Sequence, residues 1–316
     1  MDTLKKQFLN KKTYLSFLIS FLILYWIFSK IDFYLLVSSI KNTNLIWFFV
    51  AFGCFYASVF LKSIRWKLLL NDAEINIGLK DSFLIFYLSM FANAIVPAKI
   101  GDIYRSYLLK QKNSAPISLS FATVFVERIF DLMTMIPLLL IFGIISFNAN
   151  IPLEILLALK YGLVLIVLLI SFTLIFLKFN SNIMKKINNK LIKNIFTNFE
   201  KGIRTLKVKS IPKLFLLSLI SWITEGFTIY FIFLSIGLNF DILFSIFTDL
   251  SSSLLTAIPF TPSGLGIVEY ALVFILNLKN TGITESSVVI VLYRAISYFS
   301  IVILGSIAHF MYGIKK

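Results

Sequence analysis

The stretch Pro97-Ala98-Lys99-Ile100-Gly101 interrupts an otherwise apolar segment, and Pro262-Ser263-Gly264-Leu265-Gly266 interrupts another one 165 residues later. Beyond each break lies an arginine among apolar neighbours, Arg128 after the first and Arg294 after the second, at an offset of 166. Hydrophobic segments broken by Gly and Pro in corresponding halves of a chain are typical of a transport site near the middle of a membrane. The two stretches therefore suggest an internal repeat, although few of their residues are identical.

Composition places the chain among helical membrane proteins. Of 316 residues, 59% are hydrophobic and 34 are Phe, and the mean hydropathy is +0.90. A soluble globule of this length would lack the polar surface needed to cover its core. The single Cys54 excludes a disulfide framework or thiolate metal site, and the single His309 excludes His-rich metal chemistry. We expect an all-α polytopic membrane protein with no metal and no cofactor.

Nine apolar runs divide the sequence. They are residues 14–28, 45–61, 82–96, 119–145, 153–177, 214–236, 242–258, 265–278 and 286–312. A membrane crossing needs about 20 residues at about 1.5 Å each, so runs 82–96 and 265–278 are too short to be convincing crossings. No small-residue cleavage site follows run 14–28, which is therefore interpreted as an uncleaved first helix.

The distribution of charge predicts the orientation. Ten basic residues lie between runs 153–177 and 214–236, against the single acidic residue Glu200: Lys178, Lys185, Lys186, Lys190, Lys193, Lys201, Arg204, Lys207, Lys209 and Lys213. The positive-inside rule places this segment and the N-terminus in the cytoplasm. An even number of crossings must separate them, but five runs intervene. One of the five must fail to cross.

Run 82–96 is the best candidate for that failure. Four basic residues that follow it should also be cytoplasmic: Lys99, Arg105, Lys110 and Lys112. The run would enter the membrane, break at residues 97–101 and return. By the same reasoning residues 242–278 form a hairpin entered from outside, broken at Pro259, Pro262, Gly264 and Gly266.

The predicted fold is thus about six full crossings plus two re-entrant or broken hairpins that enter from opposite sides, an inverted-topology repeat. Counting each hairpin once gives eight transmembrane segments. Residues 1–316 form one transmembrane domain, with repeat halves at 45–177 and 213–316 and a cytoplasmic amphipathic basic segment at 178–212. The protein is expected in the cell membrane.

Several ionisable residues lie inside apolar runs. They are Glu127, Arg128, Asp131, Glu225, Glu269 and Arg294. An isolated charge at a helix centre costs roughly 2.5 to 3.5 kcal/mol, so a chain that keeps several should bury them together. Two interpretations apply to Glu127, Arg128 and Asp131. They either form ion pairs with one another that hold helices together, or they line a binding site. Arg294 needs Glu269, Glu225 or an anionic head group.

The two breaks also have two interpretations. Gly101 and Gly266 are either ordinary helix ends, where Gly is common, or the starts of half-helices whose free N–H groups and dipole face an anion. Lys99 and Arg105 flank the first start and favour a phosphate. Asn93 fits a buried polar contact in either case.

The basic segment contains its own apolar repeat. Phe179, Ile183, Ile187, Leu191, Ile195, Phe199 and Ile203 recur every four residues with lysines between them. This pattern predicts an amphipathic helix lying on anionic lipid head groups rather than a solvated charged linker. Lys62, Arg65, Trp66 and Lys67 are interpreted as anchors at the membrane surface.

Five stretches together resemble one known family. They are KSIRW (62–66), NAIVPAKIGDIYR (93–105), ERIFD (127–131), PFTPSGLGIVE (259–269) and Tyr293-Arg294. In this combination and order the chain resembles the lysylphosphatidylglycerol synthase transmembrane-region family, also called flippase-like integral membrane proteins. The family commonly has Glu where Asp102 stands and Gly where Ser263 stands, which puts a tight backbone approach at Ser263 in doubt.

The resemblance implies a multi-pass protein related to the flippase half of phosphatidylglycerol-aminoacylating enzymes, whose relatives also occur beside glycosyltransferases and in archaeal glycolipid pathways. The chain ends at Lys316 without an aminoacyl-transferase domain, so we do not expect lipid aminoacylation. We expect a translocase for an anionic phospholipid or polyprenyl-phosphate-linked lipid that does not hydrolyse ATP, since no GxxxxGK[ST] motif is present.

The alternative is a membrane-embedded enzyme or accessory subunit acting on a lipid-linked sugar or phospholipid, with Glu127, Asp131 or Glu269 as acid or base. The expected partners are an anionic membrane lipid and a glycosyltransferase or lipid-modifying enzyme, with no nucleic acid. The residues expected to bind substrate are Asn93, Lys99, Gly101, Asp102, Arg105, Glu127, Arg128, Asp131, Gly264, Gly266, Glu269 and Arg294.

Overall fold

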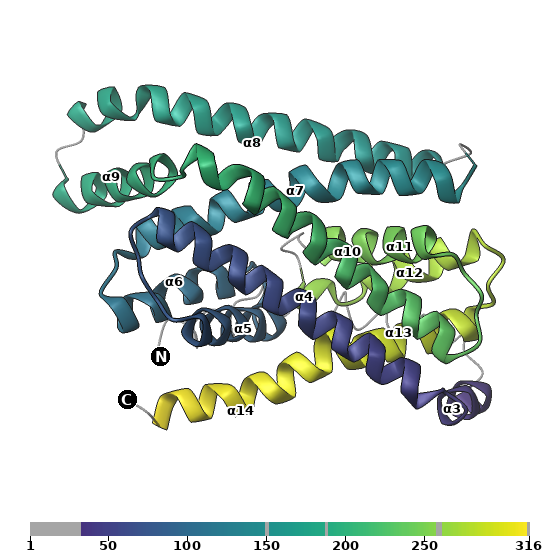
Figure 1. Ribbon diagram of the computed structural model, residues 1–316. Coiled ribbons are helices and arrows are strands. Elements are labelled where there is room, and N and C mark those ends of the chain that lie inside the picture. Colours follow the sequence, from purple (N-terminus) through teal and green to yellow (C-terminus); the bar gives the residue numbers. More distant parts are fainter. Residues whose placement is uncertain (1–32, 149–151, 187–188, 257–260, 315–316) are drawn as a thin grey trace. The chain divides into compact units, whose positions relative to one another are not determined.

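A computed structural model describes residues 33–148, 152–186, 189–256 and 261–314 of the chain, and every regular element in these residues is a helix (Figure 1). The predicted all-α class is therefore confirmed for the described part of the chain. The predicted first helix at residues 14–28 lies outside it.

Most of the helices follow the apolar runs, and three further helices lie outside them, at residues 33–41, 100–113 and 190–204. In chain order the elements are α3 (Phe33–Lys41), α4 (Leu45–Asp72), α5 (Leu79–Ile95), α6 (Ile100–Asn113), α7 (Ile117–Ser146), α8 (Leu153–Lys186), α9 (Lys190–Arg204), the 3-10 turn η1 (Val208–Ser210), α10 (Ile211–Ser235), α11 (Ile242–Thr256), the 3-10 turn η2 (Pro262–Gly264), α12 (Ile267–Asn277), α13 (Ile283–Arg294), the π-helix η3 (Ala295–Phe299) and α14 (Ser300–Ile314).

Among the described residues, five helical segments are long and apolar enough to cross a membrane. They are Leu45–Asp72, Ile117–Ser146, Ile155–Phe179, Val208–Ser235 and Ile283–Tyr312. These correspond to five of the six predicted crossings. Residues Ile242–Thr256 and Pro262–Asn277 form shorter apolar helices. The number of crossings and the orientation remain predictions.

Left-handed backbone marks both breaks. Between α5 and α6, Ala98 and Lys99 have φ of 65° and 53°; between α11 and α12, Ser263 has φ of 46°. Gly264 and Gly266 in the second break also have positive φ, where glycine avoids the steric penalty of a Cβ atom. Ser263 adopts the left-handed conformation despite carrying a side chain. Pro259, part of the predicted second break, lies outside the described residues.

The chain folds into two compact units. Unit 1 contains the described residues of Met1–Ala57, Tyr87–Gly101 and Ile223–Lys316, and unit 2 contains Ser58–Phe86 and Asp102–Trp222. The boundaries fall inside α4, α5, α6 and α10, and each unit takes residues from both of the predicted repeat halves.

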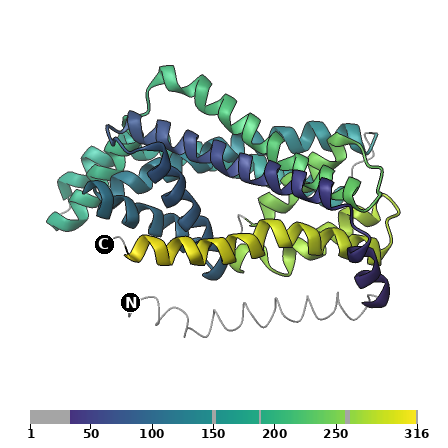
Figure 2. The same ribbon diagram turned by 60° about the horizontal axis from the view of Figure 1, so that its bottom comes forward.

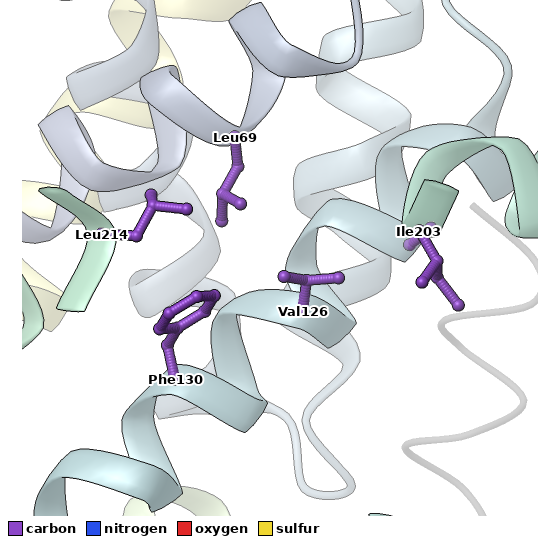
Figure 3. Close-up of a cluster of buried hydrophobic side chains, with 6 residues drawn as sticks. Leu69, Val126, Phe130, Ile203 and Leu214 are labelled. Carbon is purple, nitrogen blue, oxygen red and sulfur yellow. The ribbon is translucent and has the colours of Figure 1, made fainter. Parts of the chain in front are cut away.

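In unit 2, α8 and α9 both pack against α7 (Figure 1). The buried apolar side chains there are Leu69, Ala122, Val126, Phe130, Ile203 and Leu214. Figure 3 shows Leu69 of α4, Phe130 of α7 and Leu214 of α10 approaching one another from three helices. This apolar packing fixes the position of α7, which carries Glu127, Arg128 and Asp131.

In unit 1, α12 packs against both α11 and α13. Helix α13, the π-helix η3 and α14 follow one another as a continuous helical rod (Figure 2). Close packing brings α10 against α11, since a Cβ at Gly226 would lie 2.9 Å from the Cα atom of Ile246. The second break is therefore held among α11, α12 and α13.

Candidate functional site

Arg65 of α4 lies at the centre of unit 2. Its side chain is fully buried. Nη2 donates to Oε1 of Glu127 at 3.1 Å, and Nη1 lies 2.8 Å from Oδ1 of Asp131 and donates to the Ser218 hydroxyl at 2.6 Å. The guanidinium therefore connects α4 to both α7 and α10.

Arg105 of α6 holds the second oxygen of Glu127. Its Nη2 donates to Oε2 of Glu127 at 2.9 Å, and its guanidinium carbon lies 4.6 Å from the Trp66 ring centroid and 4.9 Å from that of Phe86. Cation–π contacts of this kind favour a buried guanidinium. Its Nε and Nη1 atoms have no hydrogen-bond partner in the described part of the chain.

Arg128 of α7 is the exposed arginine of this group. Its Nε and Nη2 donate to the two carboxylate oxygens of Asp102 at 3.3 and 3.1 Å, and Nη1 donates to Oδ2 of Asp131 at 3.1 Å. The side chain is 42% exposed, whereas those of Asp102 and Asp131 are 11% and 7% exposed. The guanidinium of Arg128 is therefore accessible at the surface of unit 2, although two buried carboxylates bind it.

Lys62 also lies in this part of unit 2. Its Nζ lies 3.5 Å from the Trp222 ring centroid, and Trp222 donates to Asp131 at 3.1 Å. We call the following seven residues the ionic cluster: Lys62, Arg65, Asp102, Arg105, Glu127, Arg128 and Asp131.

Arg294, at the end of α13 in unit 1, binds the second break. Its Nε donates to Oε1 of Glu269 at 2.7 Å, and Nη1 and Nη2 donate to the backbone carbonyls of Ser263 and Gly264 at 3.2 and 3.4 Å. The other oxygen of Glu269 accepts from the N–H of Gly266 at 2.7 Å. All three guanidinium nitrogens thus have partners, and the side chain is only 7% exposed.

The two breaks share a pattern of ion pairing. Arg128 pairs with an acid 26 residues before it, and Arg294 pairs with one 25 residues before it. Each acid, Asp102 or Glu269, lies in the first turn of the helix that starts at the break, where a negative charge favours the helix dipole. The two sites differ in exposure, because only Arg128 is accessible.

One backbone N–H group at each break already has a side-chain partner. The N–H of Gly101 donates to Oδ1 of Asn93 at 2.8 Å, and that of Gly266 donates to Glu269. These two donors are therefore satisfied within the protein. Asn93 and Lys99 are both half-buried at the first break.

The interpretation of residues 62–67 as surface anchors is wrong for three of the four residues. Lys62, Arg65 and Trp66 are buried and only Lys67 is partly exposed, because α4 continues to Asp72 and turns them inward. A sequence signal was present: Lys62, Arg65, Trp66 and Leu69 follow the three- and four-residue spacing of one helix face.

Comparison with known proteins gives a consistent result. The family model described as the lysylphosphatidylglycerol synthase TM region matches residues 14–305. A UPF0104 membrane protein of Methanocaldococcus jannaschii is 53% identical over 222 residues, which is 70% of this chain and 94% of that protein. A second UPF0104 membrane protein of the same organism is 25% identical, with 94% of each chain covered.

A shorter match points to a differently named protein. Glycosyltransferase AglD of Haloferax volcanii is 36% identical over 76 residues, which is 23% of this chain and 12% of that protein.

Proposed function

The chain belongs to the lysylphosphatidylglycerol synthase transmembrane-region family of multi-pass membrane proteins, and from this premise we propose that it is a translocase for an anionic lipid. The substrate class is a phospholipid or polyprenyl-phosphate-linked lipid, and movement across the bilayer proceeds without ATP hydrolysis.

The exposed guanidinium of Arg128 carries this proposal. A charged side chain inside an apolar helix is costly, so such residues are usually paired and often mark a functional site. A lipid phosphate can replace Asp102 as the partner of Arg128, since both groups accept two parallel hydrogen bonds from a guanidinium.

The breaks supply the path in this proposal. The segments α5–α6 and α11–α12 act as hairpins that enter the membrane from opposite faces, with the N-terminus cytoplasmic. The matched pairs Arg128–Asp102 and Arg294–Glu269 support an inverted repeat of this kind. Arg294 contributes to head-group binding only after it releases the carbonyls of Ser263 and Gly264.

A leaflet-transfer assay tests the proposal. The purified chain is reconstituted into phosphatidylcholine vesicles that contain a fluorescent phosphatidylglycerol, and a membrane-impermeant quencher reports the fraction of label in the outer leaflet. We expect the protein to accelerate exchange of the anionic label more than that of fluorescent phosphatidylcholine. Equal rates for both labels, or rates equal to those of protein-free vesicles, would contradict the proposal for this substrate.

A second function is favoured by the local similarity to a protein named a glycosyltransferase. In that case the chain is an enzyme or accessory subunit that acts on a lipid-linked sugar. Mass spectrometry of a polyprenyl-phosphate sugar after incubation with the reconstituted protein separates the two functions. A chemically altered lipid supports the enzyme, whereas an unaltered lipid in the opposite leaflet supports the translocase.

A further inference from the structure

Helix α9 is basic and amphipathic. Its 15 residues contain Lys190, Lys193, Lys201 and Arg204 against the single acid Glu200. It is too short and too polar to cross a bilayer, which requires about 20 mostly apolar residues. The apolar side chains share one face at helical spacing: Leu191, Ile192, Ile195, Phe196, Phe199 and Ile203.

The C-terminal half of this apolar face is covered by protein. Ile203 is buried, and the Phe199 ring centroid lies 5.7 Å from that of Phe125 on α7 and 5.6 Å from that of Phe176 on α8. A Cβ at Gly202 would lie 2.7 Å from the carbonyl oxygen of Leu119, so α9 touches the backbone of α7 there. This half is anchored within unit 2.

The N-terminal half of the same face is uncovered. Leu191, Ile192, Ile195 and Phe196 are exposed to between 38% and 68%. Phe196 touches the protein at its edge, with its ring centroid 6.1 Å from that of Phe176. The apolar face of α9 therefore extends past the helices that bury its other half, and Lys190 and Lys193 lie exposed on the adjacent polar face.

Two contacts fix the level of α9 relative to the apolar helices of unit 2. Arg204 donates to the carbonyl of Leu177 at 2.6 Å, close to the end of the apolar part of α8 at Phe179. Just after α9, the hydroxyl of Ser210 donates at 2.9 Å to Asp72, the last residue of α4. The C-terminal end of α9 thus lies where two apolar helices reach their polar ends, which is the depth of the lipid head groups.

We propose that the N-terminal half of α9 binds the surface of an anionic membrane. Leu191, Ile192, Ile195 and Phe196 insert between acyl chains, and Lys190 and Lys193 contact lipid phosphates. The charge of the helix is complementary to anionic lipid, and its C-terminal end lies at the level of the head groups. This role is independent of whether the chain moves lipid.

Depth measurement with spin labels tests the proposal on the full chain. Cys54 is replaced by Ser, and a nitroxide is attached to Ile192→Cys or Phe196→Cys on the apolar face. Asn194→Cys and Thr197→Cys on the polar face of the same helix are the matched controls. Collision rates with oxygen, which partitions into lipid, and with a water-soluble nickel chelate are measured in phosphatidylcholine vesicles with and without phosphatidylglycerol.

We expect the oxygen-to-nickel ratio at 192 and 196 to rise severalfold when phosphatidylglycerol is present, while 194 and 197 stay accessible to nickel. The double variant Lys190→Gln/Lys193→Gln should abolish this rise, whereas Lys209→Gln, beyond the helix, should keep it. Circular dichroism and size-exclusion profiles verify folding of each variant.

Three results would overturn the proposal. High nickel accessibility at 192 and 196 in both lipids would mean that the face is open to water. Low accessibility to both reagents would mean that protein, such as a second copy of the chain, covers it. An oxygen-to-nickel ratio that is high with or without phosphatidylglycerol, and that does not fall in the lysine variant, would show that anionic lipid is not the partner.

Discussion

Arg128 of α7 donates two hydrogen bonds to Asp102, the acid in the first turn of α6, and remains 42% exposed while doing so. The corresponding pair, Arg294 and Glu269, is buried. One of two similarly built ion pairs is therefore accessible to a ligand, and the other is enclosed by its own break.

Arg128→Lys should slow transfer of the anionic label by about tenfold, which corresponds to about 1.4 kcal/mol, because a lysine cannot form the two parallel hydrogen bonds to a phosphate. The leaflet-transfer assay measures the rate. Arg204→Lys, an exposed arginine on α9 that pairs with Glu200, is the matched control and should keep the wild-type rate. Equal rates for both variants would show that Arg128 does not bind the head group.

Arg294→Lys should impair transfer more than folding. A lysine cannot satisfy Glu269 and both carbonyls of the break at once, so the geometry of the second break should change. Transfer rate and melting temperature in detergent are measured together. If the variant keeps the wild-type transfer rate, or if it loses activity only because it no longer inserts into the membrane, Arg294 has a purely structural role.

Arg65→Met should destabilise the protein by roughly 3 to 5 kcal/mol, because it leaves Glu127 and Asp131 buried with one cation fewer. Thermal unfolding in detergent measures the loss. Lys67→Met on the same helix is the control, since Lys67 is partly exposed. A melting temperature near that of wild type would mean that the carboxylates do not depend on Arg65.

Gly101→Ala should also lower stability, by about 1 to 3 kcal/mol, since the added methyl would collide with the carbonyl oxygen of Ser89 and with Asn93. Gly53→Ala provides the control, because a Cβ there meets nothing within 4 Å. Melting temperatures of the two variants are compared. If Gly101→Ala melts no lower than Gly53→Ala, the close approach at the first break is not present.

Cysteines at Ser114 and Asn194, in a background without Cys54, should react with an impermeant thiol reagent only after the membrane is opened. Both positions are exposed, after α6 and on α9. The common side is expected because a hairpin at the first break returns the chain to the cytoplasm. Labelling of Ser114→Cys but not Asn194→Cys in intact cells would rule out that hairpin.

The local features of the fold could be predicted from the sequence, because they depend on neighbouring residues. Most of the helices follow the apolar runs, and the breaks lie at proline and glycine. The grouping of Arg128 with Asp131 needed only their three-residue spacing.

Tertiary contacts could not be predicted in the same way. Arg65 pairs with residues 62 and 66 positions away, and nothing in its own helix indicates those partners. Similarly, the apolar repeat at residues 179–203 predicted one amphipathic helix, whereas α8 continues to Lys186 and α9 begins at Lys190. The repeat also did not indicate that α7 and α8 cover half of the apolar face of α9.

The π-helix η3 has a consequence for the rod formed by α13 and α14. A turn that closes from residue i to i+5 holds one residue more than an α-turn, so every later side chain lies about 100° behind its position in a continuous α-helix. With this rotation, the hydroxyl of Ser300, the first residue after η3, is hydrogen-bonded to the hydroxyl of Tyr56 at 2.7 Å. Arg294 before η3 and Ser300 after it therefore contact different neighbours although they belong to one continuous rod. Deletion of a single residue within Ala295–Phe299 would restore the regular α-helical spacing between α13 and α14 and so rotate the side chains of α14 relative to those of α13.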